Sequence, residues 1–346
     1  MKILLPFKKE LNPYLEEIID NSIHEFTYDH YLKYDPTYDF VHIHWPEALF
    51  DWNEPSSKEL DELEVILQEW KKKSILIYTK HDFQRNKGTT KNFSRLFLLI
   101  EKHSDVFIHL GEFSKNIYRD RYPLARHEII YHPLYTHNFK LANKIDARKL
   151  LGISEDDFVM IAPGTIRSYA ERDMVLNAFE AIKQKNKVLI VTNMHAELRY
   201  DFPGRVKLKR LIDVKNLLIE KFKKTHQPPK YIFTYNIVAK EDLELKMAAA
   251  DLVMISRKNI LNSGNVFLGL TFNKVLVGPA IGNIEEQLKE LGLPLFNPKK
   301  RKSILKAIRL GRELTTTHNS YLAKKLEKYL PVNVAKRTDD LLSDLK

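Results

Sequence analysis

Short apolar runs alternate with longer amphipathic segments along most of the chain, and this alternation limits the fold more than any other feature. Runs such as 75–78 and 158–162 have the length of one strand and are apolar throughout. Continuous apolar strands separated by helices are typical of a parallel sheet that is covered by helices on both faces. We therefore predict an α/β protein.

The alternation can be followed along the chain, and it pauses once, at 133–145, where Pro133 lies. Strands are expected at 2–7, 39–44, 74–79, 106–110 and 128–131, and then at 158–162, 188–192, 231–234, 252–255 and 275–277. Helices are expected at 12–24, 60–73, 92–103, 114–121, 172–183, 241–250, 266–271, 284–291, 303–312 and 321–329. Pro331 is expected to bend the tail after the last helix, because proline cannot continue a helix.

The pause divides the chain into two units of similar pattern. We predict two Rossmann-like, doubly wound parallel-sheet domains with an interdomain cleft and a hinge at 133–145. The expected domains are 1–137 and 138–318, and a C-terminal helix within 319–346 is expected to pack back on the first domain. Ligands of such sheets bind beyond the carboxyl ends of the strands, so we expect the ligand between the domains.

The charge of the chain is unevenly distributed. Residues 1–137 carry 18 Lys and Arg against 22 Asp and Glu, whereas the whole chain has a formal net charge of +11. A basic second half attracts a phosphorylated ligand, an anionic membrane or a nucleic acid. Its stretch 205–230 fits either a solvated surface helix or a helix that lies on an anionic membrane surface. No nucleic-acid-binding module accompanies the charge, so no nucleic acid is expected as a partner.

Several classes of protein are excluded or disfavoured by what the sequence lacks. The chain has no cysteine, so it cannot form disulfides, thiolate metal sites or a cysteine nucleophile. No apolar run approaches the ~20 residues of a membrane helix, and the start of the chain is too short and too charged for a signal peptide. We expect a cytoplasmic protein. The glycine fingerprint of dinucleotide sites and the P-loop are absent, which disfavours a nicotinamide dehydrogenase or a kinase.

Histidines and acids follow the expected strands of the first domain. Strand alternation puts His42 and His44 on one face, with Glu47 just beyond the strand end. They fit core histidines, a substrate-facing loop or metal ligands, although two His and one Glu are few for a metal ion. At the end of the next strand, His81 and Asp82 stand where side chains hydrogen-bond a sugar or a phosphate.

Two loops of the second domain have the composition of an anion site. Gly164 permits a tight turn after the strand 158–162, and arginines follow it that either bind phosphate bidentately or form surface ion pairs. A second segment leads into the helix 266–271, whose free N–H groups and dipole attract an anion, unless the segment is only an ordinary cap. The residues concerned are Arg167 and Arg172 in the first loop and Asn262, Ser263, Gly264 and Asn265 in the second.

These segments together resemble the GT-B sugar-nucleotide glycosyltransferases of family 4, or group 1, and among them a subgroup of bacterial surface-polysaccharide synthesis. The resemblance is carried by VHIHWPEALF at 41–50, TKHD at 79–82, VFIHLGEFS at 106–114, His132–Pro133, LGISEDDFVMIAPGTIRSY at 151–169 and the stretch 249–286. It implies a hexosyltransferase that moves a sugar from a UDP- or GDP-linked donor to a hydroxyl of a glycan or lipid-linked acceptor. It also implies retention of the anomeric configuration, and work at the inner face of the membrane. Under this resemblance the domain 1–137 is expected to bind the acceptor and the domain 138–318 the nucleotide-sugar donor.

The resemblance and the loops define a candidate site. It contains His81, Glu47 and His44 as catalytic residues, Gly164, Arg167, Arg172, Asn262, Ser263, Gly264 and Asn265 at the donor diphosphate, and Asn12, Tyr14, Trp45 and Asp82 on the acceptor side. Fixed N–H dipoles and an arginine stabilise a leaving diphosphate without metal. We therefore expect no metal ion and no cofactor; the oligomeric state is not predicted.

The chain departs from the family pattern in two places. Ile260 and Leu268 stand where the family has a pair of glutamates, and Thr165 and Ala170 stand where it has Arg and Lys after the glycine. We expect Arg167 and Arg172 to substitute. A binding protein without activity and a sugar-nucleotide epimerase are the alternatives. An inverting reaction would need a base near the acceptor, for which Glu47, His44 and Asp82 are the candidates.

Overall fold

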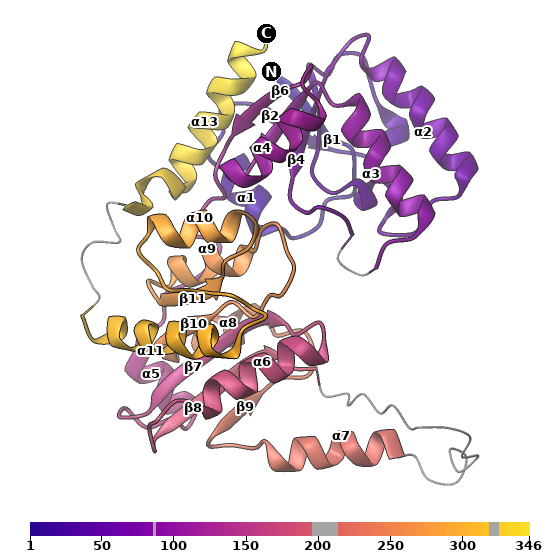
Figure 1. Ribbon diagram of the computed structural model, residues 1–346. Helices are drawn as coiled ribbons and strands as arrows, with labels where there is room; N and C mark the ends of the chain where they lie inside the picture. The colour runs from indigo at the N-terminus through magenta and orange to yellow at the C-terminus, as the bar shows by residue number, and fades with distance from the viewer. Residues whose placement is uncertain (86–87, 196–213, 318–324) are drawn as a thin grey trace.

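The computed structural model describes residues 1–85, 88–195, 214–317 and 325–346. The described residues form two parallel six-stranded sheets with helices around them, one above the other in Figure 1. We call the first sheet with its helices the N-terminal domain and the second the C-terminal domain. The predicted class, two doubly wound α/β domains, is confirmed.

The N-terminal domain has the strand order β2-β1-β3-β4-β5-β6. Its elements are β1 (Lys2–Leu5), α1 (Pro13–Ile19), β2 (Glu25–Tyr28), η1 (Tyr31–Lys33), β3 (Phe40–Ile43), η2 (Pro46–Phe50), α2 (Ser57–Trp70), β4 (Ile75–Lys80), α3 (Lys91–His103), β5 (Val106–His109), α4 (Glu112–Arg121) and β6 (Arg126–Ile129). Strand β2 was not predicted. Helix α1 begins as expected, with Pro13 in its first turn and the Asn12 side chain accepting from the Tyr14 N–H.

The C-terminal domain has the strand order β12-β11-β10-β7-β8-β9. Its elements are α5 (Lys144–Leu150), β7 (Phe158–Thr165), α6 (Tyr169–Glu180), β8 (Lys187–Asn193), α7 (Val214–Thr225), β9 (Tyr231–Phe233), α8 (Lys240–Ala249), β10 (Leu252–Met254), α9 (Gly264–Thr271), β11 (Val275–Pro279), α10 (Gly282–Glu290), β12 (Leu295–Phe296) and α11 (Arg301–Thr317). Helix α5 and strand β12 were not predicted. Of the basic stretch 205–230, residues 205–213 lie outside the described part.

Each sheet has one place where the chain reverses the direction in which it adds strands. In the N-terminal domain β2 and β3 flank β1 on opposite sides, so the switch point lies between β1 and β3. In the C-terminal domain it lies between β7 and β10. Open parallel sheets bind their ligands beyond the carboxyl ends of the strands at such a switch point. The fold therefore points to the loops after these four strands.

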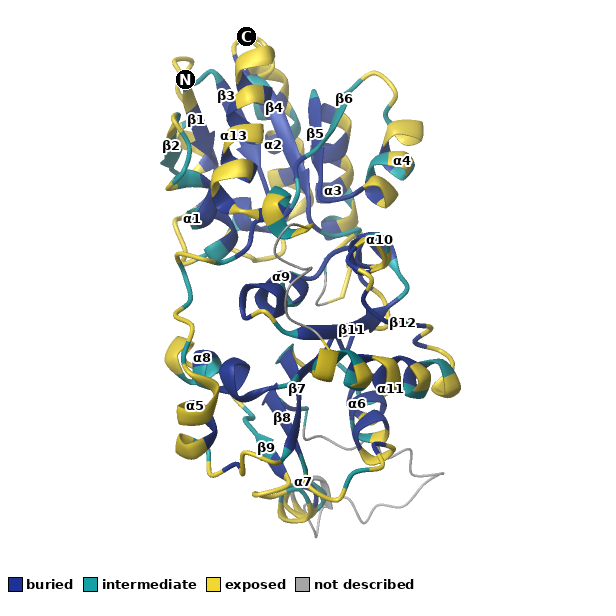
Figure 2. Cartoon of the chain, turned by 90° about the vertical axis from the view of Figure 1, so that its left-hand side faces the viewer, coloured by how far each residue is buried: buried dark blue, intermediate teal, exposed yellow. Residues whose placement is uncertain are grey.

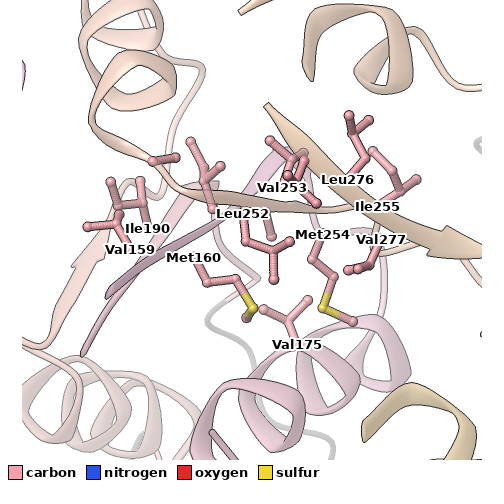
Figure 3. Close-up of a cluster of buried hydrophobic side chains, with 14 of the residues drawn as sticks. Val159, Met160, Val175, Ile190, Leu252, Val253, Met254, Ile255, Leu276 and Val277 are labelled. Carbon is pink, nitrogen blue, oxygen red and sulfur yellow. The ribbon is translucent and has the colours of Figure 1, made fainter. Parts of the chain in front are cut away.

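Apolar side chains on both faces of the sheets hold the helices in place. Figure 2 shows the inner strands of both sheets buried along most of their length, and the edge strands β2 and β6 only partly buried. In the C-terminal domain, Met160 and Met254 point from neighbouring strands toward Val175 of α6 (Figure 3), and these three side chains belong to one buried cluster. Burial on both faces explains why the strands are apolar throughout, the pattern on which the prediction rested.

The last helix corrects one prediction. Pro331 was expected to bend the tail, but it is the first residue of α13 (Pro331–Asp344), because proline is well tolerated in the first turn of a helix. Residues 321–324 of the predicted helix 321–329 lie outside the described part, and Glu327–Tyr329 form the short helix η4. Helix α13 packs on the N-terminal domain, where Val334 and Leu342 join its buried cluster. None of the described helices is both long and apolar enough to cross a membrane.

Candidate functional site

Four histidines and a tyrosine gather where the strands of the N-terminal domain end. His42 lies in β3 and His44 directly after it, and their ring centroids are 4.0 Å apart, so the predicted common face is confirmed. The His44 Nδ1 and His81 Nε2 atoms are 3.1 Å apart. The ring of Tyr14 packs edge-on against His81 and His132, with centroid distances of 4.8 and 4.9 Å. The cluster therefore connects helix α1 with the residues at the ends of β3, β4 and β6.

Burial keeps these histidines uncharged. All four are buried, and burial lowers the pKa of His42 to about 3 and that of His132 to about 4. It also lowers the pKa of His44 and His81 well below the ordinary value, with a further contribution from the neighbouring imidazoles. At neutral pH each ring offers one N–H donor and one acceptor nitrogen instead of a positive charge. Among the described residues no group of His, Asp and Glu is arranged to hold a metal ion.

The other catalytic candidate, Glu47, lies in η2 directly beyond the histidines. Its side chain is buried, and burial raises the pKa of its carboxyl group, with a smaller contribution from the charge of Asp82. A carboxyl group whose pKa moves toward neutrality is suited to proton transfer. Glu47 is also structural, since its carbonyl oxygen accepts from the Trp52 N–H at 2.9 Å.

The acceptor-side candidates lie around His81. The indole of Trp45 stacks on the His81 ring, with centroids 4.4 Å apart and an angle of 15° between the planes. Asn12 caps α1 and lines a hollow beside Trp45. Asp82 follows His81 in the chain and interacts electrostatically with Glu47. The structure thus brings together the candidates of the N-terminal domain.

In the C-terminal domain, the two predicted anion loops meet. The Asn265 side chain donates to the Pro163 carbonyl oxygen at 2.9 Å, which joins the start of α9 to the end of β7. Gly164 has a φ of 78°, and a Cβ there would lie 2.5 Å from the Asn265 Nδ2 atom, so the position requires glycine. Ser263, the residue before α9, makes no side-chain capping bond to the helix. Free N–H groups at a helix start attract an anion.

The predicted arginines differ in their surroundings. Arg172 is buried in α6, where its guanidinium binds Asp173 and lies over the rings of Tyr169 and Phe222. Arg167 lies near the turn, since its N–H donates to Glu171 Oε2 at 2.8 Å. Burial lowers the pKa of another arginine, Arg257, and the charge of Arg167 lowers it further.

Arg257 is a residue that our sequence reasoning missed. It follows β10, is only 4% exposed, and donates from Nη1 to the Thr165 carbonyl oxygen at 2.9 Å and to Glu171 at 3.1 Å. Its Nη2 atom is 3.4 Å from the Cβ position of Gly164, and its Nε–H finds no hydrogen-bond partner among the described residues. The signal was its place directly after the predicted strand 252–255, a position equivalent to that of the Gly164 turn.

Asn262 connects the two domains instead of pointing its amide at the donor turn. Its Nδ2 donates to the His81 carbonyl oxygen at 2.7 Å, and its Oδ1 accepts from Asn283 at 2.7 Å. Asn283 in turn accepts from the Ser114 N–H of α4 at 3.0 Å. We call these hydrogen bonds between the two domains the seam. Sequence reasoning missed the seam, because nothing in a sequence shows which polar side chains face another domain.

Glu286 forms the second part of the seam. Its carboxylate accepts from the N–H groups of Glu112 at 2.6 Å and Phe113 at 3.0 Å, and so caps helix α4 of the other domain. Gly111 precedes that helix, and a Cβ there would lie 1.9 Å from the Glu286 carboxylate. Only glycine allows this approach. The hydrogen bonds of Asn262 and those of Glu286 together hold the C-terminal domain against His81 and α4 of the N-terminal domain.

The comparisons with known proteins agree with this fold. No family model and no curated protein sequence matches the chain. HepE of Anabaena, solved in complex with UDP-glucose, is 16% identical over 99% of this chain and 100% of that chain, with a TM-score of 0.67. Sucrose-phosphate synthase of Thermosynechococcus elongatus is 14% identical over 91% of this chain and 75% of that chain, with a TM-score of 0.57.

A third structure, a glycosyltransferase of Rickettsia africae, is 10% identical over 89% of this chain and 77% of that chain, with a TM-score of 0.57. HepE has also been solved with UDP alone and with UDP and glucose. The chain has the GT-B fold. The prediction of two Rossmann-like α/β domains is thereby confirmed, whereas the order of the strands had not been predicted.

Proposed function

We propose that the protein is a hexosyltransferase that moves a sugar from a nucleoside-diphosphate sugar to a hydroxyl group of a glycan or lipid-linked acceptor. The main support for the proposal is that the Gly164 main chain, the start of α9 and the Arg257 guanidinium lie next to one another at one switch point. It is supported by the complexes of HepE, a protein of the same fold, with UDP and UDP-glucose. UDP or GDP is the proposed leaving group.

The arrangement suits a reaction in which negative charge grows on a leaving diphosphate. Fixed N–H groups and a buried guanidinium are already oriented, so they stabilise that charge without rearrangement as the glycosidic bond breaks. Arg257 would contact the diphosphate directly, with Arg167 adding positive charge nearby. We include independence of a metal ion in the proposal, because these groups supply the charge that a divalent cation would otherwise provide.

We further propose that the reaction retains the anomeric configuration, with the leaving diphosphate taking the proton of the acceptor hydroxyl. Under this proposal His81 and His44 position substrate as neutral hydrogen-bonding groups, and Glu47 is not the base. Proton NMR of the first product formed gives the anomeric configuration. The variant Glu47→Gln is expected to keep most of the transfer activity; loss of nearly all activity, together with an inverted product, would assign Glu47 as the base of an inverting enzyme.

The donor assignment is tested with a panel of UDP, GDP, CMP and dTDP. Ligand that binds only the folded protein stabilises it by about 2.7 kcal/mol at a concentration of 100 Kd, so one nucleotide is expected to raise the melting temperature clearly. Addition of 5 mM EDTA is expected to leave this shift unchanged. A panel without any shift would refute the proposal.

The alternatives give different products in a transfer assay. Transfer of the sugar to an added glycan or polyprenyl-linked acceptor is the expected result. Tight nucleotide binding without turnover of any donor would indicate a binding protein. Conversion of the donor to another sugar nucleotide without acceptor would indicate an epimerase.

We also propose that the protein is cytoplasmic and binds the inner membrane face from there. The support is helix α7, which carries Lys221, Lys223 and Lys224 and exposes Leu217. Co-sedimentation with vesicles of phosphatidylglycerol is expected at low salt and should weaken at 0.5 M NaCl, since salt screens the attraction. Equal sedimentation with neutral vesicles would contradict it.

A further inference from the structure

The loops at the switch point of the N-terminal domain line a surface hollow that is open to solvent. Lys8, Glu10 and Asn12 from the loop after β1 and Trp45, Asp51 and Trp52 from the loop after β3 line it. The hollow therefore occupies, on the first sheet, the position that the proposed diphosphate site occupies on the second. Topology alone makes it the expected ligand position of its domain.

The backbone of one wall is strained. Asp51 and Trp52 have φ angles of 49° and 65°, and they are two of only three non-glycine residues with positive φ in the described part of the chain. Side chains with a Cβ disfavour this conformation, and for tryptophan it is a genuine outlier. Such strain gathers at ligand-binding sites, because the surrounding structure must hold it in place. Here the turn is held by the Trp52 N–H, which donates to the Glu47 carbonyl oxygen at 2.9 Å.

The strained turn presents an indole to solvent. Trp52 is 41% exposed, and its Nε1–H donates to Glu10 Oε1 at 3.2 Å, which ties the turn to the loop after β1. Trp45 contributes the second indole of the hollow. The hollow thus combines two flat apolar surfaces with the carboxylates of Glu10 and Asp51 and the amide of Asn12.

A saccharide ring matches this set of groups. Its C–H face packs on an indole, and its hydroxyl groups donate to carboxylate oxygens and exchange hydrogen bonds with an amide. The charge argues against an anionic ligand, because the two carboxylates outnumber Lys8, the one cation that lines the hollow. A diphosphate or a phospholipid head group would be repelled here. The ligand class is therefore a neutral sugar.

Trp45 and His81 connect the hollow to the loop before α9, the helix whose start belongs to the proposed donor site. Trp45, which lines the hollow, stacks on His81 at 4.4 Å, and the His81 carbonyl oxygen accepts from Asn262 in the loop before α9. We propose that the hollow binds a neutral sugar ring of the acceptor and presents one of its hydroxyl groups toward the donor. This inference rests on the proposed function and narrows the acceptor to a glycan that is recognised by its sugar.

Saturation-transfer difference NMR on the full chain with 1 mM cellobiose, lactose and diacetylchitobiose tests the inference. At least one disaccharide is expected to receive saturation from the wild type. The variant Trp52→Gly removes the indole at a φ that glycine adopts freely, so its melting temperature is not expected to fall, and its affinity for that disaccharide should drop at least tenfold. Leu11→Ala, on an exposed residue that does not line the hollow, is the matched control and should bind as the wild type does.

The outcomes separate the two proposals. No saturation of any disaccharide, unchanged affinity in Trp52→Gly, or binding of polyprenyl phosphate in place of the sugars would overturn the inference, while UDP still raises the melting temperature. Loss of UDP binding by the wild type would instead refute the proposed function. In a transfer assay with the identified sugar, Trp52→Gly is expected to raise the acceptor KM at least tenfold and to leave the donor KM unchanged.

Discussion

The two domains offer the same topological position with opposite chemistry. At the switch point between β7 and β10 lie a glycine turn, a helix start and the buried Arg257. At the switch point between β1 and β3 lie two indoles, two carboxylates and neutral histidines. The fold determines where a ligand binds, and the loop residues determine which ligand. One domain is suited to an anion and the other to a neutral polar ring.

Acid should affect the two domains differently, and this is the largest effect that we expect. Burial lowers the pKa of His42 and His109 to about 3 and that of His132 to about 4, and the first two lie in the N-terminal sheet. These histidines bind fewer protons in the folded protein than in the unfolded chain. The free energy of unfolding is therefore undiminished by them above pH 6.5 and decreases as the pH falls toward 4. The three together should cost about 3 to 6 kcal/mol between pH 7 and pH 5.

Tryptophan fluorescence measures this loss selectively, since Trp45, Trp52 and Trp70 are the only tryptophans of the chain and all belong to the N-terminal domain. The urea midpoint followed by fluorescence should fall more between pH 7 and pH 5 than a midpoint followed by circular dichroism. His109→Phe should reduce the fall, and His30→Gln, on an exposed histidine, should not. Coincident transitions at both pH values would contradict the difference between the domains.

The second prediction concerns the anion site. Arg257→Leu should weaken UDP binding by about 2 to 3 kcal/mol, or ~30- to 150-fold, because hydrogen bonds between charged groups contribute that much. Affinity for uridine, which lacks the phosphates, should not change. Calorimetric titration of both ligands distinguishes this from misfolding, which would weaken both.

Arg257→Lys and Arg119→Leu complete that series. The lysine keeps the charge without the planar fork, so its UDP affinity should fall between those of the wild type and Arg257→Leu. Arg119, an exposed residue of α4, serves as the control and should have no effect. Equal UDP affinity in wild type and Arg257→Leu would remove Arg257 from the site.

The third prediction separates backbone strain from the contact between the two loops. Gly164→Ala and Gly152→Ala both place a side chain at positive φ, but only the first brings its Cβ near Asn265. Each should lose about 1 kcal/mol of stability. Only Gly164→Ala should also weaken UDP binding, because Asn265 and the start of α9 must move. Similar UDP affinity in both variants would mean that the contact does not shape the site.

The smallest effect is expected at the seam. Glu286→Ala leaves two N–H groups of α4 without their cap, at a cost of about 1 kcal/mol, and should favour an open arrangement of the domains. Small-angle scattering should show a larger radius of gyration than for Glu285→Ala, on an exposed residue of the same helix. UDP should reduce the difference by favouring closure about 133–145. Identical scattering curves for both variants would show that the Glu286 hydrogen bonds do not hold the two domains together.

The class of fold could be predicted from the sequence, and the order of strands could not. Buried parallel strands are apolar throughout, so β4 and β7 were visible, whereas β2 at the sheet edge is only half-buried and carries a mixed pattern. The order depends on which side of β1 each crossover packs, which local sequence does not encode. The switch points, and with them the hollow beside Trp52, therefore became visible only in three dimensions.

The parts of the candidate site that depend on turns and helix starts could be predicted from the sequence. The parts that depend on contacts between distant side chains could not. Gly164 and Asn265 could be proposed as site residues because turns and helix starts have compositional signals. Arg257 was missed, because an arginine after a strand resembles any surface arginine until its burial is known. Asn262 was predicted at the diphosphate, and its bonds to His81 and Asn283 connect the domains instead.

Helix α13 has a consequence for dividing the molecule experimentally. The chain leaves the first domain near residue 137 and returns to it at Pro331, where Asp339 accepts from the Ile23 N–H and Leu342 enters the buried cluster. A fragment cut at 137 would expose that cluster and should aggregate. A permuted protein that joins 331–346 through a short linker to residue 1 should fold as an independent lobe, since the two ends lie side by side in Figure 1.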